Sequence, residues 1–256
     1  TFLLKDATYD LAASGIGFNE IAGASAVNTV TFKPDVGVTS TIRSSVGGSI
    51  IQLNGTDYFI LDGSNTVGGT SKDLTIESYN ALASGSSPAC VALYGQAVDK
   101  GCTYNVIKNC IFTGVSPVPA APAITCYGIT LNNQDNDNNT IRNNTFKKIG
   151  TAISSNSSST TINDNLVIDK NLIDLESVAN NALFRTGIYV NRANNCTISN
   201  NIIQNAETCN SNADLLGITL GSEISNLTIT GNIIKGIVQN STVDHYVKGI
   251  VISPSI

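Results

Sequence analysis

Short segments of alternating hydrophobic and polar residues recur along the chain, with polar turns between them. The clearest copies have a β-branched residue at the second place and Asn at the fifth; they span residues 105–109, 140–144, 161–165, 197–201 and 228–232. Two residues beyond each final Asn stands a further apolar residue: Ile111, Phe146, Val167, Ile203 and Ile234. Alternation with a period of two indicates strands with one buried face.

A second repeated segment begins with Gly-Ile and interleaves with the first. Its copies start at Gly128, Gly187, Gly217 and Gly249, with a looser copy at Gly150. One repeat is therefore a Gly-Ile strand, a short turn, a Thr-Ile strand, an Asn corner, a third short strand and a connection of variable length.

Stacked repeats of this kind predict a solenoid, because no single repeat can bury its apolar face alone. We predict an all-β, right-handed parallel β-helix with three short strands per coil, covering residues 1–256 as one domain. Residues 1–50 are expected to form irregular N-terminal coils and residues 51–256 regular ones. Earlier strands are expected at residues 29–32, 41–42, 49–53, 58–61, 74–77 and 90–93.

The repeated Asn residues are expected to mark one corner of every coil. Asn tolerates the left-handed backbone region better than other non-Gly residues, and its amide can hydrogen-bond to an Asn one coil above. This predicts a structural ladder of Asn109, Asn144, Asn165, Asn201 and Asn232.

Variation in repeat length is expected to fall in the connection that follows the third strand. These connections, at residues 113–123, 174–186, 204–216 and 236–248, should emerge along one edge, beside the face that carries the Gly-Ile strands.

Composition and charge narrow the class of protein. Only 13% of residues are charged and 41% are hydrophobic, so Asn, Ser and Thr supply the polar surface. The net charge is −5, and no cluster of Lys and Arg exceeds the pair Lys147-Lys148, which disfavours a nucleic-acid partner. No apolar run approaches the roughly 20 residues that span a bilayer, so membrane insertion is not expected.

Six cysteines fit an oxidising compartment, and we expect at least one disulfide, with buried free thiols as the alternative. If Leu93 aligns with Ile129, Cys90 stacks on Cys126 one coil away. Neighbouring parallel strands offer poor disulfide geometry, which favours this pair as two small buried side chains. The cysteines form no CxxC pair and the chain has a single His, so neither a metal site nor a cofactor is expected.

Four segments carry a family resemblance: residues 6–9 (DATY), 28–34 (NTVTFKP), 53–64 (LNGTDYFILDGS) and 139–144 (NTIRNN). The chain resembles the β-helix region of large secreted, adhesin-like surface proteins of Bacteroidota, which carry a C-terminal signal for type IX secretion. The resemblance implies a parallel β-helix exported to the outer surface of a bacterium. The chain has neither an initiator Met nor a signal peptide, and we expect it to be a portion of something larger.

A polysaccharide hydrolase would need two or three carboxylates on outward positions of neighbouring Gly-Ile strands. The expected outward residues are Ala92, Tyr94, Thr130, Tyr189, Thr219 and Val251. None is acidic, and the single His, His245, falls in a variable connection. No catalytic residue is therefore assigned.

A Ca²⁺-dependent polysaccharide lyase would need a base and a carboxylate cluster. Arg185, Arg192 and Lys248 stand beside Gly-Ile strands, and Asp135 and Asp137 form the densest acidic pair. The acidic segment resembles a calcium loop, but Phe146 occupies the place of its last carboxylate. A solvated turn is the simpler interpretation, and an atypical lyase remains an alternative.

Glycan binding without catalysis is the other alternative, because a groove beside the Gly-Ile face suits an extended sugar chain. Aromatic rings usually form such platforms, and the chain has no Trp. The candidate glycan-binding residues are Tyr94 and Tyr189 with Thr130 and Thr219; tyrosines simply covered by the connections are the simpler interpretation.

The leading interpretation is a non-enzymatic structural or adhesive β-helix, a rigid stalk or display segment outside the cell. An extracellular glycan is its candidate ligand. An uncapped solenoid exposes strand edges and open core at each end. Each end is therefore expected to meet further coils of the same chain or another protein.

Overall fold

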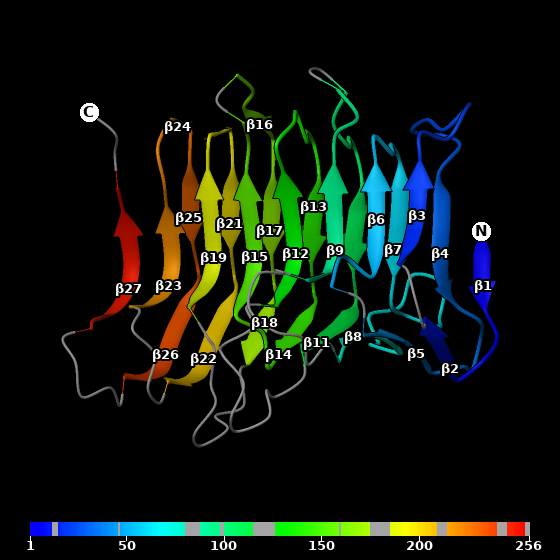
Figure 1. The fold of residues 1–256 in the computed structure, drawn as a ribbon, viewed down its shortest axis with the longest axis horizontal. Coiled ribbons are helices and arrows are strands. Elements are labelled where there is room, and N and C mark those ends of the chain that lie inside the picture. The colour runs from blue at the N-terminus through cyan, green and yellow to red at the C-terminus, as the bar shows by residue number, and fades with distance from the viewer. Residues whose placement is uncertain are drawn as a thin grey trace.

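The computed structural model describes residues 1–11, 15–45, 47–79, 88–97, 100–114, 126–158, 160–174, 185–208, 214–239 and 245–253. Within these ranges every regular element is a β-strand. The strands stack along one long axis, with the chain's two ends at opposite ends of the stack (Figure 1). The fold is the predicted all-β, right-handed parallel β-helix.

Three eight-stranded sheets run the length of the molecule, and each strand pairs in parallel with its equivalent in the next coil. The first sheet contains β1 (Phe2–Leu4), β4 (Val30–Pro34), β7 (Phe59–Asp62), β10 (Val106–Lys108), β13 (Thr140–Arg142), β17 (Val167–Asp169), β21 (Thr197–Ser199) and β25 (Thr228–Thr230). The second sheet contains β2 (Thr8–Leu11), β5 (Ser40–Ser44), β8 (Leu74–Ser78), β11 (Cys110–Gly114), β14 (Thr145–Lys147), β18 (Leu172–Asp174), β22 (Ile202–Thr208) and β26 (Ile233–Gln239). The third sheet contains β3 (Ile16–Asn19), β6 (Ile51–Asn54), β9 (Ala89–Tyr94), β12 (Tyr127–Asn132), β15 (Thr151–Asn156), β19 (Thr186–Asn191), β23 (Leu215–Leu220) and β27 (Val247–Ile252).

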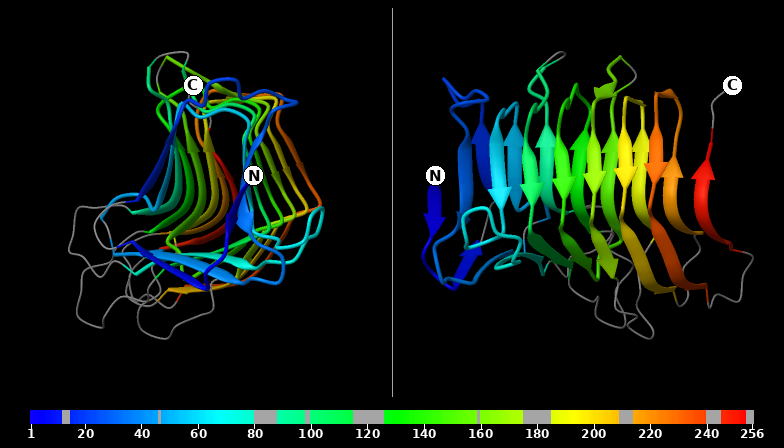
Figure 2. Two further views of the ribbon diagram at one scale, coloured as in Figure 1. Left: turned by 90° about the vertical axis from the view of Figure 1, so that its right-hand side faces the viewer. Right: turned by 180° about the vertical axis from the view of Figure 1, so that it is seen from behind.

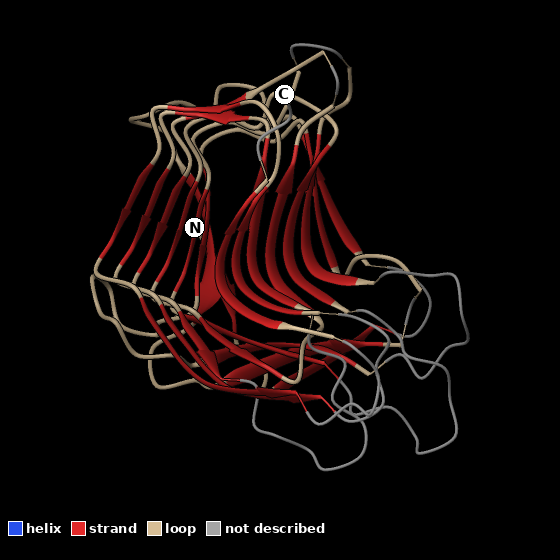
Figure 3. Cartoon of the chain, turned by 90° about the vertical axis from the view of Figure 1, so that its left-hand side faces the viewer, coloured by secondary structure: helices blue, strands red, loops and turns tan. Residues whose placement is uncertain are grey.

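Each coil passes through the first, second and third sheet in turn, so the cross-section is roughly triangular (Figure 2). A small extra sheet of β16 (Asn163–Asp164), β20 (Ala193–Asn194) and β24 (Ile224–Ser225) lies at the corner between the third and first sheets. Figure 3 shows this corner above the two long sides, viewed along the axis. The Gly-Ile strands form the third sheet, and four of the five Thr-Ile segments lie in the first, as the repeat predicts.

Inward side chains stack in continuous columns along the axis. On the third sheet, Val91, Ile129, Ile153, Ile188 and Ile218 pair in register, and each is at most 1% exposed. Burying one such side chain contributes about 2 kcal/mol. A single coil could not bury these side chains alone, so stacking of repeats is needed for folding.

Glycine begins the Gly-Ile strand because the inward space at that corner is already filled. A Cβ on Gly187 would lie 2.6 Å from the carbonyl oxygen of Gly217 and 2.8 Å from Cδ1 of Ile203. A Cβ on Gly217 would meet Ile234 in the same way. The apolar residue of the third strand therefore dictates Gly in the Gly-Ile strand at the start of the same repeat.

The segment at residues 161–165 occupies a different corner from the other four copies of its motif. Ile141 pairs with Ile168, and Ile168 with Ile198, so β17 supplies the first-sheet strand of that coil. Asn165 therefore lies at the corner between the third and first sheets, where its amide donates to Asn138. The placement of Asn165 in the ladder was wrong, because both corners use Asn residues next to short strands.

Asn171 occupies the position that had been given to Asn165. The backbone N–H groups of Asn144, Asn171 and Asn201 donate to the side-chain oxygens of Asn171, Asn201 and Asn232, respectively, at 2.9–3.0 Å. We call Asn144, Asn171, Asn201 and Asn232 the inner Asn column.

The left-handed residue of this corner precedes the inner Asn column by one position. It is Asn109, Asn143, Lys170, Asn200 or Gly231 in successive coils, with φ between 53° and 64°. Asn109 is thus one residue earlier than predicted, and Cys110 donates its backbone N–H to Asn144 in its place. Asn109 instead bridges Asp62 and Asn143 outside the core, through side-chain hydrogen bonds of 2.7 Å.

The cysteines Cys90, Cys102, Cys110, Cys126 and Cys196 are buried free thiols, and Cys209 lies outside the described residues. The expected disulfide is therefore absent among these five. Val91, not Leu93, pairs with Ile129, so the predicted register was wrong by two residues. Cys90 and Cys126 are nevertheless hydrogen-bonded thiols in adjacent coils, and this contact together with burial raises the pKa of Cys90.

The four variable connections join the second sheet to the third, so their described ends follow one edge of the solenoid. Most of residues 113–123, 174–186, 204–216 and 236–248 lies outside the described residues. In the part of the chain that the structure describes, no helix has the length and apolar character needed to cross a membrane.

Candidate functional site

Outward side chains of the third sheet form three parallel columns. The middle column runs through Gln52, Ala92, Thr130, Ser154, Tyr189, Thr219 and Val251, one residue per coil. A second column runs through Asn19, Asn54, Tyr94, Asn132, Asn156 and Asn191. The third runs through Ala89, Tyr127, Thr151, Thr186, Leu216 and Lys248. These columns lie on the sheet that faces the viewer in Figure 1.

A groove of about 420 Å³ crosses these columns on four consecutive coils. Ten of the described residues line it: Tyr94, Tyr127, Thr130, Asn132, Thr151, Ser154, Asn156, Arg185, Thr186 and Tyr189. Adjacent strands lie about 4.8 Å apart, so the groove extends about 14 Å along the axis. A groove of this volume falls within the range of small-molecule sites. We call it the third-sheet groove.

The groove exists because small outward residues lie between larger ones. Thr130 and Ser154 face outward but are only 5% and 7% exposed, and tyrosines line the groove beside them. The hydroxyl of Tyr94 lies 3.3 Å from that of Ser49, so its ring reaches back across the preceding coil, and Ala92 is fully buried. Small floor residues and tyrosine walls thus produce a concave site on an otherwise flat sheet.

The floor carries many neutral hydrogen-bonding groups. Thr130 donates to the side-chain oxygen of Asn132 at 2.8 Å, and Asn191 donates to that of Asn156 at 2.9 Å. Among the described residues, none accepts from or donates to the hydroxyls of Thr151, Ser154 and Thr186, which leaves them available to a ligand. This mixture of hydroxyls, amides and tyrosine rings matches the hydroxyl groups and apolar ring faces of a sugar.

Three of the four candidate glycan-binding residues line this groove, namely Tyr94, Thr130 and Tyr189. Thr219 follows Tyr189 in the same column but lies beyond the lining residues. Its hydroxyl oxygen is buried and has no hydrogen-bond partner within the described residues. The single histidine, His245, lies away from the groove, with Nδ1 3.7 Å from the carboxylate of Asp214.

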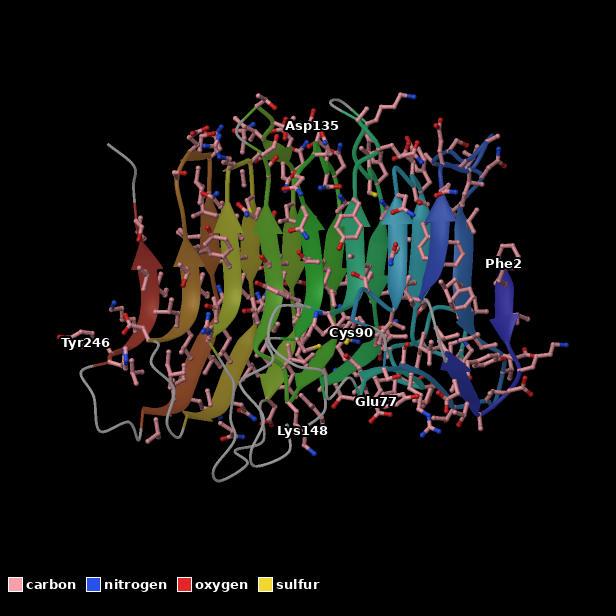
Figure 4. All side chains as sticks on the ribbon, viewed as in Figure 1. Phe2, Glu77, Cys90, Asp135, Lys148 and Tyr246 are labelled. Carbon is pink, nitrogen blue, oxygen red and sulfur yellow. The ribbon has the colours of Figure 1, made fainter. Side chains whose placement is uncertain are left out.

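The acidic pair Asp135 and Asp137 belongs to the turn after β12, where Figure 4 labels Asp135. Burial, with the nearby charges of Asp135 and Asp164, raises the pKa of Asp137 to about 6. Asp137 also accepts a 2.7 Å hydrogen bond from the backbone N–H of Asp164. Within the described ranges, no three His, Cys, Asp or Glu side chains are grouped so that they could hold a metal ion.

A second groove of about 440 Å³ lies on the outer face of the first sheet near the N-terminal end. Leu3, Val36 and Val67 contribute to its lining, together with the ion pair of Lys108 and Asp62 at 3.0 Å. Its mainly apolar walls, and charges that neutralise one another, suit a sugar less well than the third-sheet groove does.

Sequence reasoning missed several lining residues, although a signal for them was present. Tyr127 and Thr186 directly precede the Gly of a Gly-Ile strand, and Asn132 and Asn156 end the outward alternation of theirs. Sequence reasoning also did not identify a pair of buried Asn residues at the corner that precedes the first sheet. There Asn105 accepts from the backbone N–H of Phe59, and Asn139 from that of Asn105. Each of these Asn residues directly precedes its first-sheet strand.

Comparison with known proteins supports the architecture. No family model and no curated protein matches the chain. A mannuronic acid specific family 6 polysaccharide lyase from human gut microbiota superposes with a TM-score of 0.55 and 14% identity, covering 98% of this chain and 60% of the lyase. A candidate glycosyl hydrolase from Parabacteroides merdae gives a TM-score of 0.48 and 11% identity, over 79% of this chain and 82% of that one. Pectate lyase Pel9A gives a TM-score of 0.43 and 13% identity, over 99% of this chain and 68% of the lyase. At 14% identity the likeness to the family 6 lyase shows the parallel β-helix fold alone.

Proposed function

We propose that this chain is an extracellular, non-catalytic β-helix that displays a glycan-binding groove, as part of a bacterial surface or adhesive protein. The observation that carries the proposal is the third-sheet groove, with Tyr94, Tyr127 and Tyr189 around a floor of neutral hydroxyl and amide groups. Tyrosine faces stack on sugar rings, and a floor of donors and acceptors orients the sugar hydroxyls.

The groove's chemistry favours binding over hydrolysis. A glycosidase needs two carboxylates across the scissile bond, and none of the ten lining residues that the structure describes is acidic. The atypical lyase is the second candidate, since tyrosine can act as a general acid or base and Arg185 lines the same groove. Its Ca²⁺ requirement finds no matching carboxylate group among the described side chains.

The location outside the cell rests on the resemblance to secreted surface proteins and on a surface built from neutral polar residues. Buried thiols are compatible with an oxidising compartment, because Cys90, Cys102 and Cys110 are fully buried. Labelling of intact cells with an antibody against the chain tests this location; signal only after cell lysis contradicts it.

The binding function is tested with a glycan array, followed by calorimetry on the best ligand. Removing an aromatic stacking partner costs about 1 kcal/mol, so Tyr94→Ala and Tyr189→Ala should each weaken binding about fivefold. Ser154→Trp, which fills the groove, should abolish binding. Tyr246→Ala, an exposed tyrosine at the far end labelled in Figure 4, should change nothing. Unchanged binding in all three groove variants sinks the proposed site. Ca²⁺-dependent growth of the absorbance of an unsaturated sugar product would instead show a lyase.

A further inference from the structure

Three basic residues stand beside third-sheet strands, and two of them are neutralised by carboxylates. The guanidinium of Arg192 lies 2.8 Å from the carboxylate of Glu223, and the ammonium of Lys248 pairs with Asp214. Arg185 differs, because its guanidinium forms no ion pair or hydrogen bond with any residue the structure describes. Its backbone N–H donates to the carbonyl of Gly150 at 2.8 Å, which fixes the start of β19 beside the groove.

Among the described residues that line the third-sheet groove, Arg185 alone carries a formal charge. Its neighbours there include Thr186 and, one coil back, Thr151, both of which present hydroxyls. A guanidinium offers a planar fork of donors that binds a carboxylate through two parallel hydrogen bonds. Arg185 is exposed, so its guanidinium is accessible to a ligand carboxylate, and salt will screen the pair.

We infer that the ligand of the third-sheet groove is an acidic glycan, with a uronate carboxylate seated on Arg185. The tyrosines and neutral floor contact the sugar rings and hydroxyls, while Arg185 selects the charge. The chain's net charge of −5 repels polyanions at long range, so recognition depends on this local cation. The inference rests on the proposed glycan-binding function and adds the class of glycan.

The test compares short oligomers of galacturonate, glucuronate, mannuronate and guluronate with the same oligomers after reduction of their carboxyl groups. Wild-type protein should bind at least one uronate oligomer about tenfold or more tightly than its reduced counterpart, since a charge-assisted hydrogen bond is worth about that factor. Arg185→Gln should remove this preference and leave affinity for the reduced oligomer unchanged. Arg142→Gln, an exposed arginine on the first sheet, is the matched control and should alter neither affinity. Raising the salt concentration should weaken uronate binding by the wild type far more than by Arg185→Gln.

Two results would overturn the inference while leaving glycan binding intact: equal affinity for charged and reduced oligomers, or wild-type uronate affinity in Arg185→Gln. Failure of every oligomer and every array glycan to bind would instead remove the proposed function itself. The two failures are therefore distinguishable in one set of titrations.

Discussion

The inner Asn column should contribute strongly to stability, and Asn171 is its most informative member. Asn171 is 1% exposed; its side-chain oxygen accepts from the backbone N–H of Asn144 at 3.0 Å, and its amide donates to the carbonyl of Ile141 at 3.0 Å. Asn171→Ala removes both partners at once. The N–H of Asn144 then remains buried without a hydrogen bond, and the carbonyl of Ile141, which lies in the β13–β17 ladder, loses one of its donors.

A buried N–H left unpaired costs about 1–3 kcal/mol and the lost bond to the Ile141 carbonyl about 1 kcal/mol more, so Asn171→Ala should lower the free energy of unfolding by about 3 kcal/mol. The side-chain amide of Asn144 keeps its bond to Ile107, and the oxygen of Asn201 still accepts from the N–H of residue 171. Two further bonds are lost, from the amide of Asn144 to Asn171 and from the amide of Asn171 to Asn201, but the surviving groups keep these other partners, so both losses add little.

Urea unfolding followed by circular dichroism measures the change, and hydrogen exchange at the Asn144 amide reports the local effect. Asn165→Gly is the matched control, because Asn165 has φ of 57° and is only half-buried at the other corner. Gly keeps that conformation accessible, so the control should cost less than about 1 kcal/mol. The assignment of the column would be refuted if the two variants lost equal free energies of unfolding. It would also be refuted if hydrogen exchange at the Asn144 amide were no faster in Asn171→Ala.

Three further outcomes follow from particular side chains. The pKa of Asp137 is raised to about 6, so the folded state holds its proton more tightly and stability falls as pH rises from 3.8 to about 6. Asp137→Asn should therefore stabilise the protein above pH 6, by at most about 1 kcal/mol after solvent screening, and not below pH 3.8; equal urea midpoints above pH 6 would contradict this. In a Cys209→Ser background, a thiol reagent should label none of the five described cysteines until denaturant is added, because burial raises the pKa of Cys102 to about 11 and that of Cys196 to about 12; rapid native labelling would show that the thiols are accessible. Finally, Ile250 and Ile252 continue inward columns but are 51% and 68% exposed, so the isolated chain should self-associate in sedimentation experiments, and Ile250→Asp with Ile252→Asp should reduce it; a wild-type monomer at all concentrations would argue against open ends.

The fold was predictable because its signal is repeated in nearly every coil. The inward residues Ile188 and Ile218 each follow a Gly. A Cβ added to that Gly would collide with Ile203 or Ile234, so the same steric requirement produces a Gly-Ile dipeptide in each of these coils. At Gly249 in the last coil, no atom lies within 4 Å of the added Cβ. A constraint that recurs in successive coils can therefore be recognised from one sequence alone.

Register was harder to predict, because two corners of the coil use the same residue type for different purposes. The side chain of Asn171 is buried and hydrogen-bonds to the backbone, whereas that of Asn165 is half-buried and hydrogen-bonds to the side chains of Asn138 and Asn195. Each stands three residues after an Ile and just beyond a short strand, so the local pattern could not separate them. The Cys90 alignment failed for a related reason: Val91 and Leu93 are both inward, and either could pair with Ile129.

The groove shows why function in this fold escapes a repeat-based prediction. Stability comes from inward columns, which tolerate little change, while outward positions are free to vary in size from coil to coil. The middle column of the third sheet reads Ala92, Thr130, Ser154, Tyr189, and the hollow forms where small residues meet a large one. Depth therefore depends on the difference between successive coils, which only the correct register reveals. By the same reasoning, groove variants such as Ser154→Trp should fold normally, so a loss of binding in them can be assigned to the site.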